Sequence, residues 1–204
     1  MKRLSPLHAI HANKGATFDE HLGWQTPSPA NMSSATTITI TDQSWDCTVE
    51  IVGAQAGEVL TAAFGAAPEK NGDVVFTEAQ VVIGRITPNR YLLIAELSSN
   101  ALEIVNQHVG DSFVPTPNVT VTDQTEGQAG LYIGGDDSST LLSKLCGLDL
   151  HPSVFPVNTV KISSVAKVRG TIWRLEDGWH VYFGRSYLRY VYETVVQAGA
   201  EFGV

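Results

Sequence analysis

The sequence predicts an α+β fold made of two similar halves, each with an antiparallel sheet and packed helices. The first observation is a repeat. Residues 38–44 (ITITDQS) recur 81 positions later as residues 119–125 (VTVTDQT), with four identical positions and three conservative exchanges. The second observation is that similar strand and helix patterns follow both segments in the same order. This order predicts internally duplicated ferredoxin-like units, each with one added strand and its helices on one face of the sheet.

Further matches extend the repeat along the chain. The same offset pairs Val52-Gly53 with Ile133-Gly134, Leu60 with Leu141 and Phe64 with Leu145, and residues 90–94 match residues 178–182 at an offset of 88. The Pro115-Thr116-Pro117 segment suits a stiff joint between the halves. We therefore expect an N-terminal arm (1–33), a first α+β repeat (34–115) and a second α+β repeat (116–204).

Residues of the arm are polar, and we expect a short helix near Pro6–Lys14 followed by an irregular segment. In each repeat, alternation of β-branched and polar residues predicts half-buried strands. The strands expected in the first repeat are Thr37–Thr41, Cys47–Val52, Val74–Thr77, Val81–Ile86 and Arg90–Ala95. Those expected in the second are Val119–Thr122, Ala129–Ile133, Thr159–Ser163, Lys167–Trp173 and Trp179–Phe183.

Two helices are expected in each repeat, one after the second strand and one at the end. Polar residues before each apolar stretch predict side-chain caps, namely Asp136 to Ser139, Ser98 or Ser99, and Ser186. Gly147 is expected to stop one helix. The expected inward faces are Leu141, Leu142 and Leu145, then Leu102, Val105 and His108, then Leu188, Val191 and Val195.

Composition excludes several classes of function. The net charge is −8 and no Lys/Arg-rich run is present, which argues against nucleic-acid binding. No apolar run is long enough to span a bilayer or to act as a signal peptide, so we expect a cytoplasmic protein. Cys47 and Cys146 are expected to be reduced and buried.

Three groups of polar residues suggest chemistry but favour a simpler interpretation. His8, His11 and His21 lie near Asp19 and Glu20, yet no metal-binding spacing appears, so we expect no metal. Gly134-Gly135 leads into a helix, but the two aspartates that follow would repel an anion. No nucleophile motif is present, and we predict no catalytic residue.

The segment 173–180 (WRLEDGWH) is the best candidate for a ligand site. Trp173 and Trp179 are suited to stack on a heterocycle while Glu176 accepts its hydrogen bonds. The alternative is a β-hairpin whose Glu-Asp-Gly makes the turn and whose tryptophans are core or interface anchors. On the closing helix, Arg185, Arg189 and Tyr192 are expected to share an exposed face that binds a protein partner, with a solvated helix face as the alternative.

Several segments resemble one family. Leu7-His8, Gly15-Ala16, Phe18, Gly23-Trp24, Pro27, residues 120–125, Ile133-Gly134-Gly135, Glu176–Trp179 and residues 197–203 resemble signatures of the glycine-cleavage T-protein (aminomethyltransferase) family. The resemblance covers nearly the whole chain and implies a duplicated α+β folate-binding region. It also implies a catalytic aspartate near Ala79 or Gln80, neither of which can act as the carboxylate. Of the family's Tyr-Thr-Gly-Glu element, only Glu176 is retained.

Residues 145–156, Trp173-Arg174 and Arg185-Ser186-Tyr187 look like the gamma subunit of heterotetrameric sarcosine oxidase. That class oxidatively demethylates sarcosine and passes the one-carbon unit to tetrahydrofolate. The resemblance implies a non-catalytic subunit, with flavins and NAD on larger partner subunits. Two alternatives stay open: a stand-alone folate-binding aminomethyltransferase that binds tetrahydrofolate through Glu176, and a homodimeric binding module.

Overall fold

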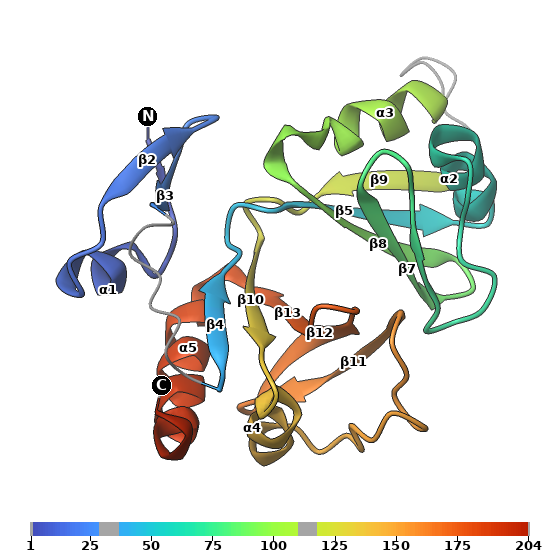
Figure 1. The fold of residues 1–204 in the computed structure, drawn as a ribbon. Helices are drawn as coiled ribbons and strands as arrows, with labels where there is room; N and C mark the ends of the chain where they lie inside the picture. Colours follow the sequence, from blue (N-terminus) through green and yellow to red (C-terminus); the bar gives the residue numbers. More distant parts are fainter. Residues whose placement is uncertain (1, 29–36, 110–117, 204) are drawn as a thin grey trace. The chain divides into compact units, whose positions relative to one another are not determined.

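The computed structural model describes residues 2–28, 37–109 and 118–203, and the chain divides into two compact units (Figure 1). Unit 1 comprises Met1–Trp45, Gln128–Val157 and Ile162–Val204, and unit 2 comprises Asp46–Gly127 and Asn158–Lys161. Each contains helices and a five-stranded sheet whose recorded pairings are antiparallel, so the predicted mixed α and β class with antiparallel sheets is confirmed.

Unit 2 is built on a sheet of order β6-β7-β8-β5-β9. Its strands are β5 (Cys47–Gly53), β6 (Val74–Phe76), β7 (Val81–Thr87), β8 (Arg90–Ala95) and β9 (Val119–Asp123). Helices α2 (Ala56–Phe64) and α3 (Ala101–His108), the latter preceded by the 3-10 turn η2 (Leu97–Ser99), contribute to one core with the sheet. Val49, Ile51 and Leu93 from the strands pack there with Leu60 and Val105, because period-two and helical patterns each place apolar residues on one face.

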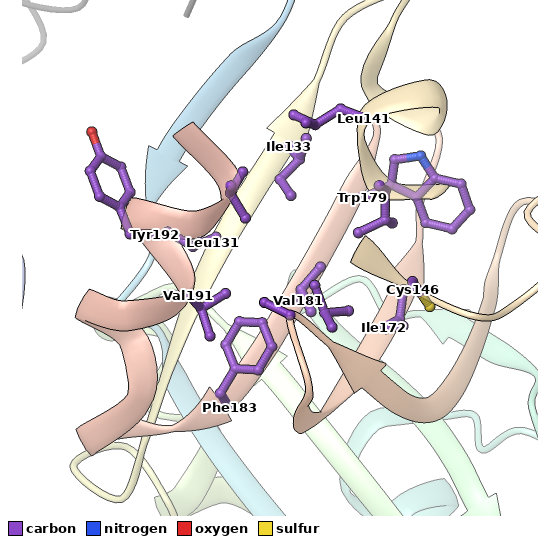
Figure 2. Packing of buried hydrophobic residues seen from close by; sticks show 14 of the residues in the cluster. Leu131, Ile133, Leu141, Cys146, Ile172, Trp179, Val181, Phe183, Val191 and Tyr192 are labelled. Carbon is purple, nitrogen blue, oxygen red and sulfur yellow. The ribbon is translucent and has the colours of Figure 1, made fainter. Parts of the chain in front are cut away.

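Unit 1 has a sheet of order β11-β12-β13-β10-β4. Its strands are β4 (Thr39–Asp42), β10 (Gln128–Gly134), β11 (Thr159–Val165), β12 (Val168–Arg174) and β13 (Trp179–Gly184). Helices α4 (Ser138–Leu145) and α5 (Leu188–Gly199), with 3-10 turns η3 (Arg185–Tyr187) and η4 (Ala200–Phe202), complete it. Figure 2 shows Leu131 and Ile133 of β10 and Val181 of β13 packed with Val191 of α5 in one apolar core.

The first strand of each predicted repeat pairs in the sheet that the other half builds. β4 lies antiparallel to β10, with Ile40 opposite Ile133 and Asp42 opposite Leu131. β9 lies antiparallel to β5, with Val121 opposite Ile51 and Asp123 opposite Val49. Each sheet is therefore completed by an edge strand from a distant part of the chain.

The register corrects the repeat alignment by one residue. Ile51 is opposite Tyr91 and Ile133 is opposite Trp179, and both pairs belong to the apolar cores. Ile133 therefore occupies the position of Ile51, and the expected pairing of Val52 with Ile133 is wrong. A one-residue slip would turn every side chain of the strand to the other face of the sheet.

Two glycines, at or just after the ends of β5 and β10, support the same one-residue shift in the repeat alignment. Gly53 (φ 152°) and Gly135 (φ 95°) both have positive φ, and a Cβ would collide with the carbonyl oxygen of Asn118 at Gly53 and of Thr37 at Gly135. Since these carbonyls belong to the segments before β9 and β4, Gly135 rather than Gly134 corresponds to Gly53. Only glycine tolerates both the conformation and the close backbone approach.

The N-terminal arm is more regular than predicted. Helix α1 (His8–Asn13) agrees with the expected helix, but β1 (Arg3–Leu4), β2 (Phe18–His21) and β3 (Trp24–Pro27) form a three-stranded sheet of order β1-β3-β2 where we expected an irregular segment. Leu22 (φ 49°) and Gly23 (φ 83°) make the tight turn that joins β2 to β3. Leu-Gly before Trp24 was the available sequence signal for this hairpin.

Asp42 holds the arm to unit 1. Its carboxylate, 2% exposed, accepts hydrogen bonds from the Ser5 and Ser44 hydroxyls and from the Ser44 backbone N–H (3.0 Å). His11 Nε2 lies 3.3 Å from the same carboxylate. Because four donors converge on one buried acceptor, Asp42 is a polar anchor between the arm and the rest of unit 1.

Of the predicted side-chain caps, the one at Ser99 is present, because its hydroxyl accepts the backbone N–H of Ala101, the first residue of α3 (3.4 Å). The caps predicted for α4 and α5 are wrong, since neither helix has a side-chain cap hydrogen bond. Ser139 instead accepts the indole N–H of Trp179 (3.1 Å), and Ser186 lies within η3. Tertiary partners and a preceding 3-10 turn replace the local caps that the sequence pattern favoured. At the other end of α4, the helix ends at Leu145, two residues before Gly147.

Candidate functional site

The β12–β13 hairpin carries the predicted ligand-site residues. Residues 175–178 form its tip, closed by a hydrogen bond from Leu175 N–H to Gly178 O (2.9 Å). Gly178 has φ 151°, and a Cβ there would lie 2.9 Å from the carbonyl oxygen of Ile133, so the turn requires glycine. Glu176 is exposed at this tip.

The two predicted stacking residues lie on opposite faces of the sheet. Trp173 is opposite His180 and is 0% exposed, and its indole N–H donates to the Thr171 hydroxyl (3.2 Å). Trp179 is opposite Arg174 and belongs to the unit 1 core, as Figure 2 shows. The structure does not bring the two indole faces together beside Glu176, because adjacent positions along a strand alternate between faces.

The structure instead gathers four other polar groups next to the tip. His180 Nδ1 lies 2.9 Å from Oε1 of Gln43, and Nε2 lies 3.1 Å from both carboxylate oxygens of Asp177. Tyr132 donates its hydroxyl to the Asp177 carbonyl (2.7 Å), and its ring lies 5.1 Å from the His180 ring. We call Gln43, Tyr132, Asp177 and His180 the His180 cluster.

Hydrogen bonding in the His180 cluster limits what it can do chemically. Nε2–H donates to the Asp177 carboxylate. Nδ1 is also hydrogen-bonded: in one arrangement it donates to Gln43 Oε1, and in the other, with the Gln43 amide flipped, it accepts from the amide nitrogen. Neither ring nitrogen is left to exchange a proton with a substrate. Burial, and secondarily the charge of Asp177, raises the pKa of Tyr132, so this phenol stays protonated.

The predicted interface residues of the closing helix have different surroundings. Arg185 donates to the carbonyls of Ser44 (3.1 Å) and Leu4 (2.7 Å) and lies 4.8 Å over the Trp24 ring. Tyr192, 8% exposed, contributes to the core and accepts a hydrogen bond from Lys14 (3.1 Å). Of the three, only Arg189 is exposed, and it pairs with Glu193. The expected single exposed face is therefore wrong, because the arm covers Arg185 and Tyr192.

The remaining candidates are dispersed. His8 stacks on Phe18 (4.2 Å), His11 contacts Asp42, and His21 is exposed in β2. Within residues 2–28, 37–109 and 118–203, no three metal-binding side chains converge. No helix in those same ranges has the length and apolar character needed to cross a membrane. Cys47 and Cys146 are free and buried, as predicted, and burial raises the pKa of the Cys47 thiol.

The His180 cluster was missed by sequence reasoning. Asp177 in the hairpin tip and His180 three residues later in β13 were a local signal that both could lie together. Gln43 and Tyr132 reach the cluster only through the β4-β10-β13 pairing, which joins residues from distant parts of the chain. No local pattern could have placed them there.

The observed antiparallel sheets, packed helices and polar hairpin tip agree with the aminomethyltransferase-like architecture that the sequence resemblance implies. The family model described as the GCVT N-terminal domain matches residues 7–204. The chain belongs to this family, and the resemblance stated from the sequence is confirmed.

Two known proteins that are similar in sequence to this chain are gamma subunits of sarcosine oxidase. The chain is 26% identical over 154 residues to the sarcosine oxidase subunit gamma of Corynebacterium sp. (strain U-96), covering 74% of this chain and 73% of that one. The corresponding subunit from Arthrobacter sp. is 27% identical over 155 residues, with the same coverage.

Two solved structures share the fold. One chain of the heterotetrameric sarcosine oxidase from Corynebacterium sp. U-96 superposes with a TM-score of 0.77 at 22% identity, covering 99% of this chain and 97% of that chain. Aminomethyltransferase T of the glycine cleavage system from Bartonella henselae gives a TM-score of 0.75 at 17% identity, covering 96% of this chain and 57% of that one.

Proposed function

We propose that this chain is a gamma-type subunit of a heterotetrameric sarcosine-oxidase-like complex and contributes structure rather than a catalytic group. The observation that carries the proposal is the near-complete mutual coverage with one chain of such a complex, 99% and 97%. Three gamma-subunit relatives, each aligned over about two thirds or more of this chain, support it. In this proposal, flavins, NAD and the folate that receives the one-carbon unit bind to larger subunits. The cytoplasmic location stays a prediction.

The chemistry of the described residues supports a non-catalytic role. Proton transfer at a folate nitrogen needs a positioned acid or base. Ala79 and Gln80, near which the resemblance implies the family's aspartate, are exposed in the turn before β7 and have no carboxylate of their own. His180 has both nitrogens occupied. Glu176 is exposed at a hairpin tip, and across the described residues no hydrogen bond or ion pair holds its carboxylate in place.

Of the three predicted interface residues, Arg189 remains a candidate for the contact with a partner subunit. It is exposed on α5 between Tyr187 and Tyr190, which are 54% and 50% exposed. Tyrosine and arginine are enriched at protein interfaces, and two half-exposed rings beside a cation suit a surface that a partner covers. We place the partner contact of unit 1 here.

Co-purification tests the proposal. The tagged chain, co-expressed with the large flavin-bearing subunits of its source, should elute with them as one flavin-containing complex. Arg189→Glu should weaken the association about tenfold or more, since it reverses an interfacial charge. Arg169→Glu, at an exposed position on β12, serves as the control and should co-elute unchanged. Elution of the parent chain without flavin subunits would contradict the proposal.

A stand-alone folate-binding protein is the second candidate, because Glu176 keeps the family's glutamate in an exposed position. Titration with tetrahydrofolate, followed by tryptophan fluorescence, separates the two. Saturable quenching in the micromolar range that Glu176→Ala abolishes, and that Glu126→Ala leaves intact, would favour this candidate. We expect no saturable quenching, because Trp173 and Trp179 are 0% and 2% exposed and their rings are not open to stacking by a ligand.

We also infer that the halves derive from one duplicated ferredoxin-like unit, with repeats at 34–115 and 116–204 after an arm at 1–33. The sheet orders β6-β7-β8-β5-β9 and β11-β12-β13-β10-β4 support this, because their strands correspond one to one when β4 and β9 are exchanged. The matching environments of Gly53 and Gly135 support it independently.

A further inference from the structure

An open groove of about 680 Å³ lies on unit 2, between helix α2 and the β7–β8 hairpin. This volume falls within the range of small-molecule sites. Gly57 and Thr61 of α2 line one side, and Arg85, Asn89 and Tyr91 line the other. None of the groups in the His180 cluster contributes to it.

Tyr91 presents an unpartnered hydroxyl to this groove. The residue is only 4% exposed and its ring belongs to the unit 2 core, yet it lines the groove. A Cβ on Gly57 would lie 2.9 Å from its hydroxyl oxygen, so the hydroxyl reaches the first turn of α2. Across the described part of the chain, this hydroxyl has no hydrogen-bond partner. Because the hydroxyl oxygen opens to the groove, a ligand oxygen bound there would accept its hydrogen bond.

Arg85 places a fixed positive charge beside that hydroxyl. Its guanidinium donates to the carbonyls of Glu69 and Pro88 and lies 5.5 Å over the Tyr91 ring. Its Nε is buried without a partner, and within the described ranges no carboxylate pairs with the side chain. A half-buried guanidinium held by neutral carbonyls keeps its charge available to an anion.

Unit 1 has an equivalent pair of an arginine over an aromatic ring, but there other side chains occupy the space that is open in unit 2. Arg174 lies 4.8 Å over the Trp179 ring and donates to the carbonyls of Leu150 (3.0 Å) and Phe155 (3.2 Å). The Phe155 ring, 0% exposed, packs edge-on against Trp179 at 5.2 Å. Ser139 accepts the indole N–H, whereas the corresponding helix position in unit 2 is Gly57. Unit 2 therefore lacks both the aromatic plug and the hydroxyl that complete this site in unit 1.

The groove is richer in donors than in acceptors. Helix α2 has no side-chain cap, so the backbone N–H groups of its first turn lack intrahelical acceptors. These donors, Arg85 and the Tyr91 hydroxyl favour an oxygen-bearing anion, while Glu58 at the rim disfavours a second negative charge. The remaining walls are apolar: Ala54, Ala62, Ala67, Pro68 and Pro88. We propose that the groove binds a small monocarboxylate with an apolar, ring-sized body, its carboxylate against Arg85 and Tyr91.

Titration of the full-length ¹⁵N-labelled chain with 3-phenylpropionate tests the proposal. Saturable amide shifts are expected at residues 54–58 and 85–91, and 3-phenylpropanamide, which lacks the charge, should bind at least tenfold more weakly. Tyr91→Phe removes only the hydroxyl and should weaken binding about tenfold, as for a lost hydrogen bond to a charged group. Gly57→Ser, which imitates Ser139, should weaken it similarly.

Two further variants complete the design. Glu58→Gln should tighten binding, and Arg169→Gln, which removes one positive charge from unit 1, should leave it unchanged. Arg85→Lys keeps the charge but loses the planar fork, so weaker binding with a native-like spectrum is expected. Equal affinity for acid and amide, no saturable shift, or unchanged binding by Tyr91→Phe and Arg85→Lys would overturn the proposal. These outcomes do not depend on assembly with a flavin subunit.

Discussion

Replacing Asp42 by alanine should release the N-terminal arm, and the chain supplies its own control in Asp123. Both aspartates accept a backbone N–H two residues later, from Ser44 (3.0 Å) and Thr125 (2.9 Å) respectively. Asp123 is exposed, whereas Asp42 is covered by the arm. The local turn is thus common to both sites, and the contacts with the arm belong to Asp42 alone.

The expected loss of stability depends on how many hydrogen-bond donors each substitution leaves without an acceptor. Asp42→Ala removes the acceptor of two buried hydroxyls, Ser5 and Ser44, which lie 3.2 Å apart. One hydroxyl can donate to the other, so one buried donor stays unpaired and the charge-assisted bonds are lost, at about 3–5 kcal/mol in total. Asp123→Ala loses one bond at an exposed turn, at about 0.5–1 kcal/mol.

Amide hydrogen exchange measures the effect of the two substitutions on the arm itself. In Asp42→Ala, protection of the β1–β3 amides, including that of Trp24, should fall by at least 30-fold, while β5 and β8 amides stay protected. Asp123→Ala should leave the arm protected. Equal loss of protection in the two variants would refute the reasoning, because it would mean that the arm contacts of Asp42 add nothing to the turn.

Three other predictions follow from local geometry. Gly178→Ala should destabilise the chain by about 1–3 kcal/mol in urea denaturation, because of its φ of 151° and the close Ile133 carbonyl, whereas Gly147→Ala, with open space around it, should change stability by less than about 0.5 kcal/mol. The folded-state pKa of Tyr132 is raised above 10.0, so its contribution to stability is complete below pH 10.0 and is lost as pH rises through the folded pKa. Tyr132→Phe should reduce this alkaline loss, and an unchanged slope would count against the assignment. Fragments 1–115 and 116–204 should fold only when co-expressed, because β4 and β9 each complete the other fragment's sheet; independent folding of either in circular dichroism would contradict this.

Local periodicity was sufficient to predict most elements. β8 spans Arg90–Ala95 as expected, and β5 differs from its predicted range by one residue, because alternation of buried and exposed side chains is encoded over a few positions. Leu188, Val191 and Val195 face the core as predicted, since helical spacing places them on one side. The repeat itself was visible because β4 and β9 conserve their alternation and the following Asp-Gln.

Other features depend on contacts that no local pattern encodes. The pairing of β4 with β10 joins residues about ninety positions apart, so the environment of Gln43 was not predictable. The repeat offset changes by one residue in the turn after Thr125, which identity between short segments does not reveal but burial does. The burial of Tyr192 depends on the arm, whose sheet the sequence pattern did not indicate.

If the two units derive from one duplicated unit, as proposed, the features that they share belong to the common fold. The residues that differ between them then indicate where their roles differ. Arg85 and Arg174 both lie over an aromatic ring of the neighbouring strand, so this pair belongs to the shared scaffold. Phe155 and Ser139 then complete the site in unit 1, which becomes ordinary core. In unit 2 the same positions are left open, and the Tyr91 hydroxyl faces the groove. The open groove of unit 2, and not the buried indoles of unit 1, is therefore where we propose that this chain binds a small molecule.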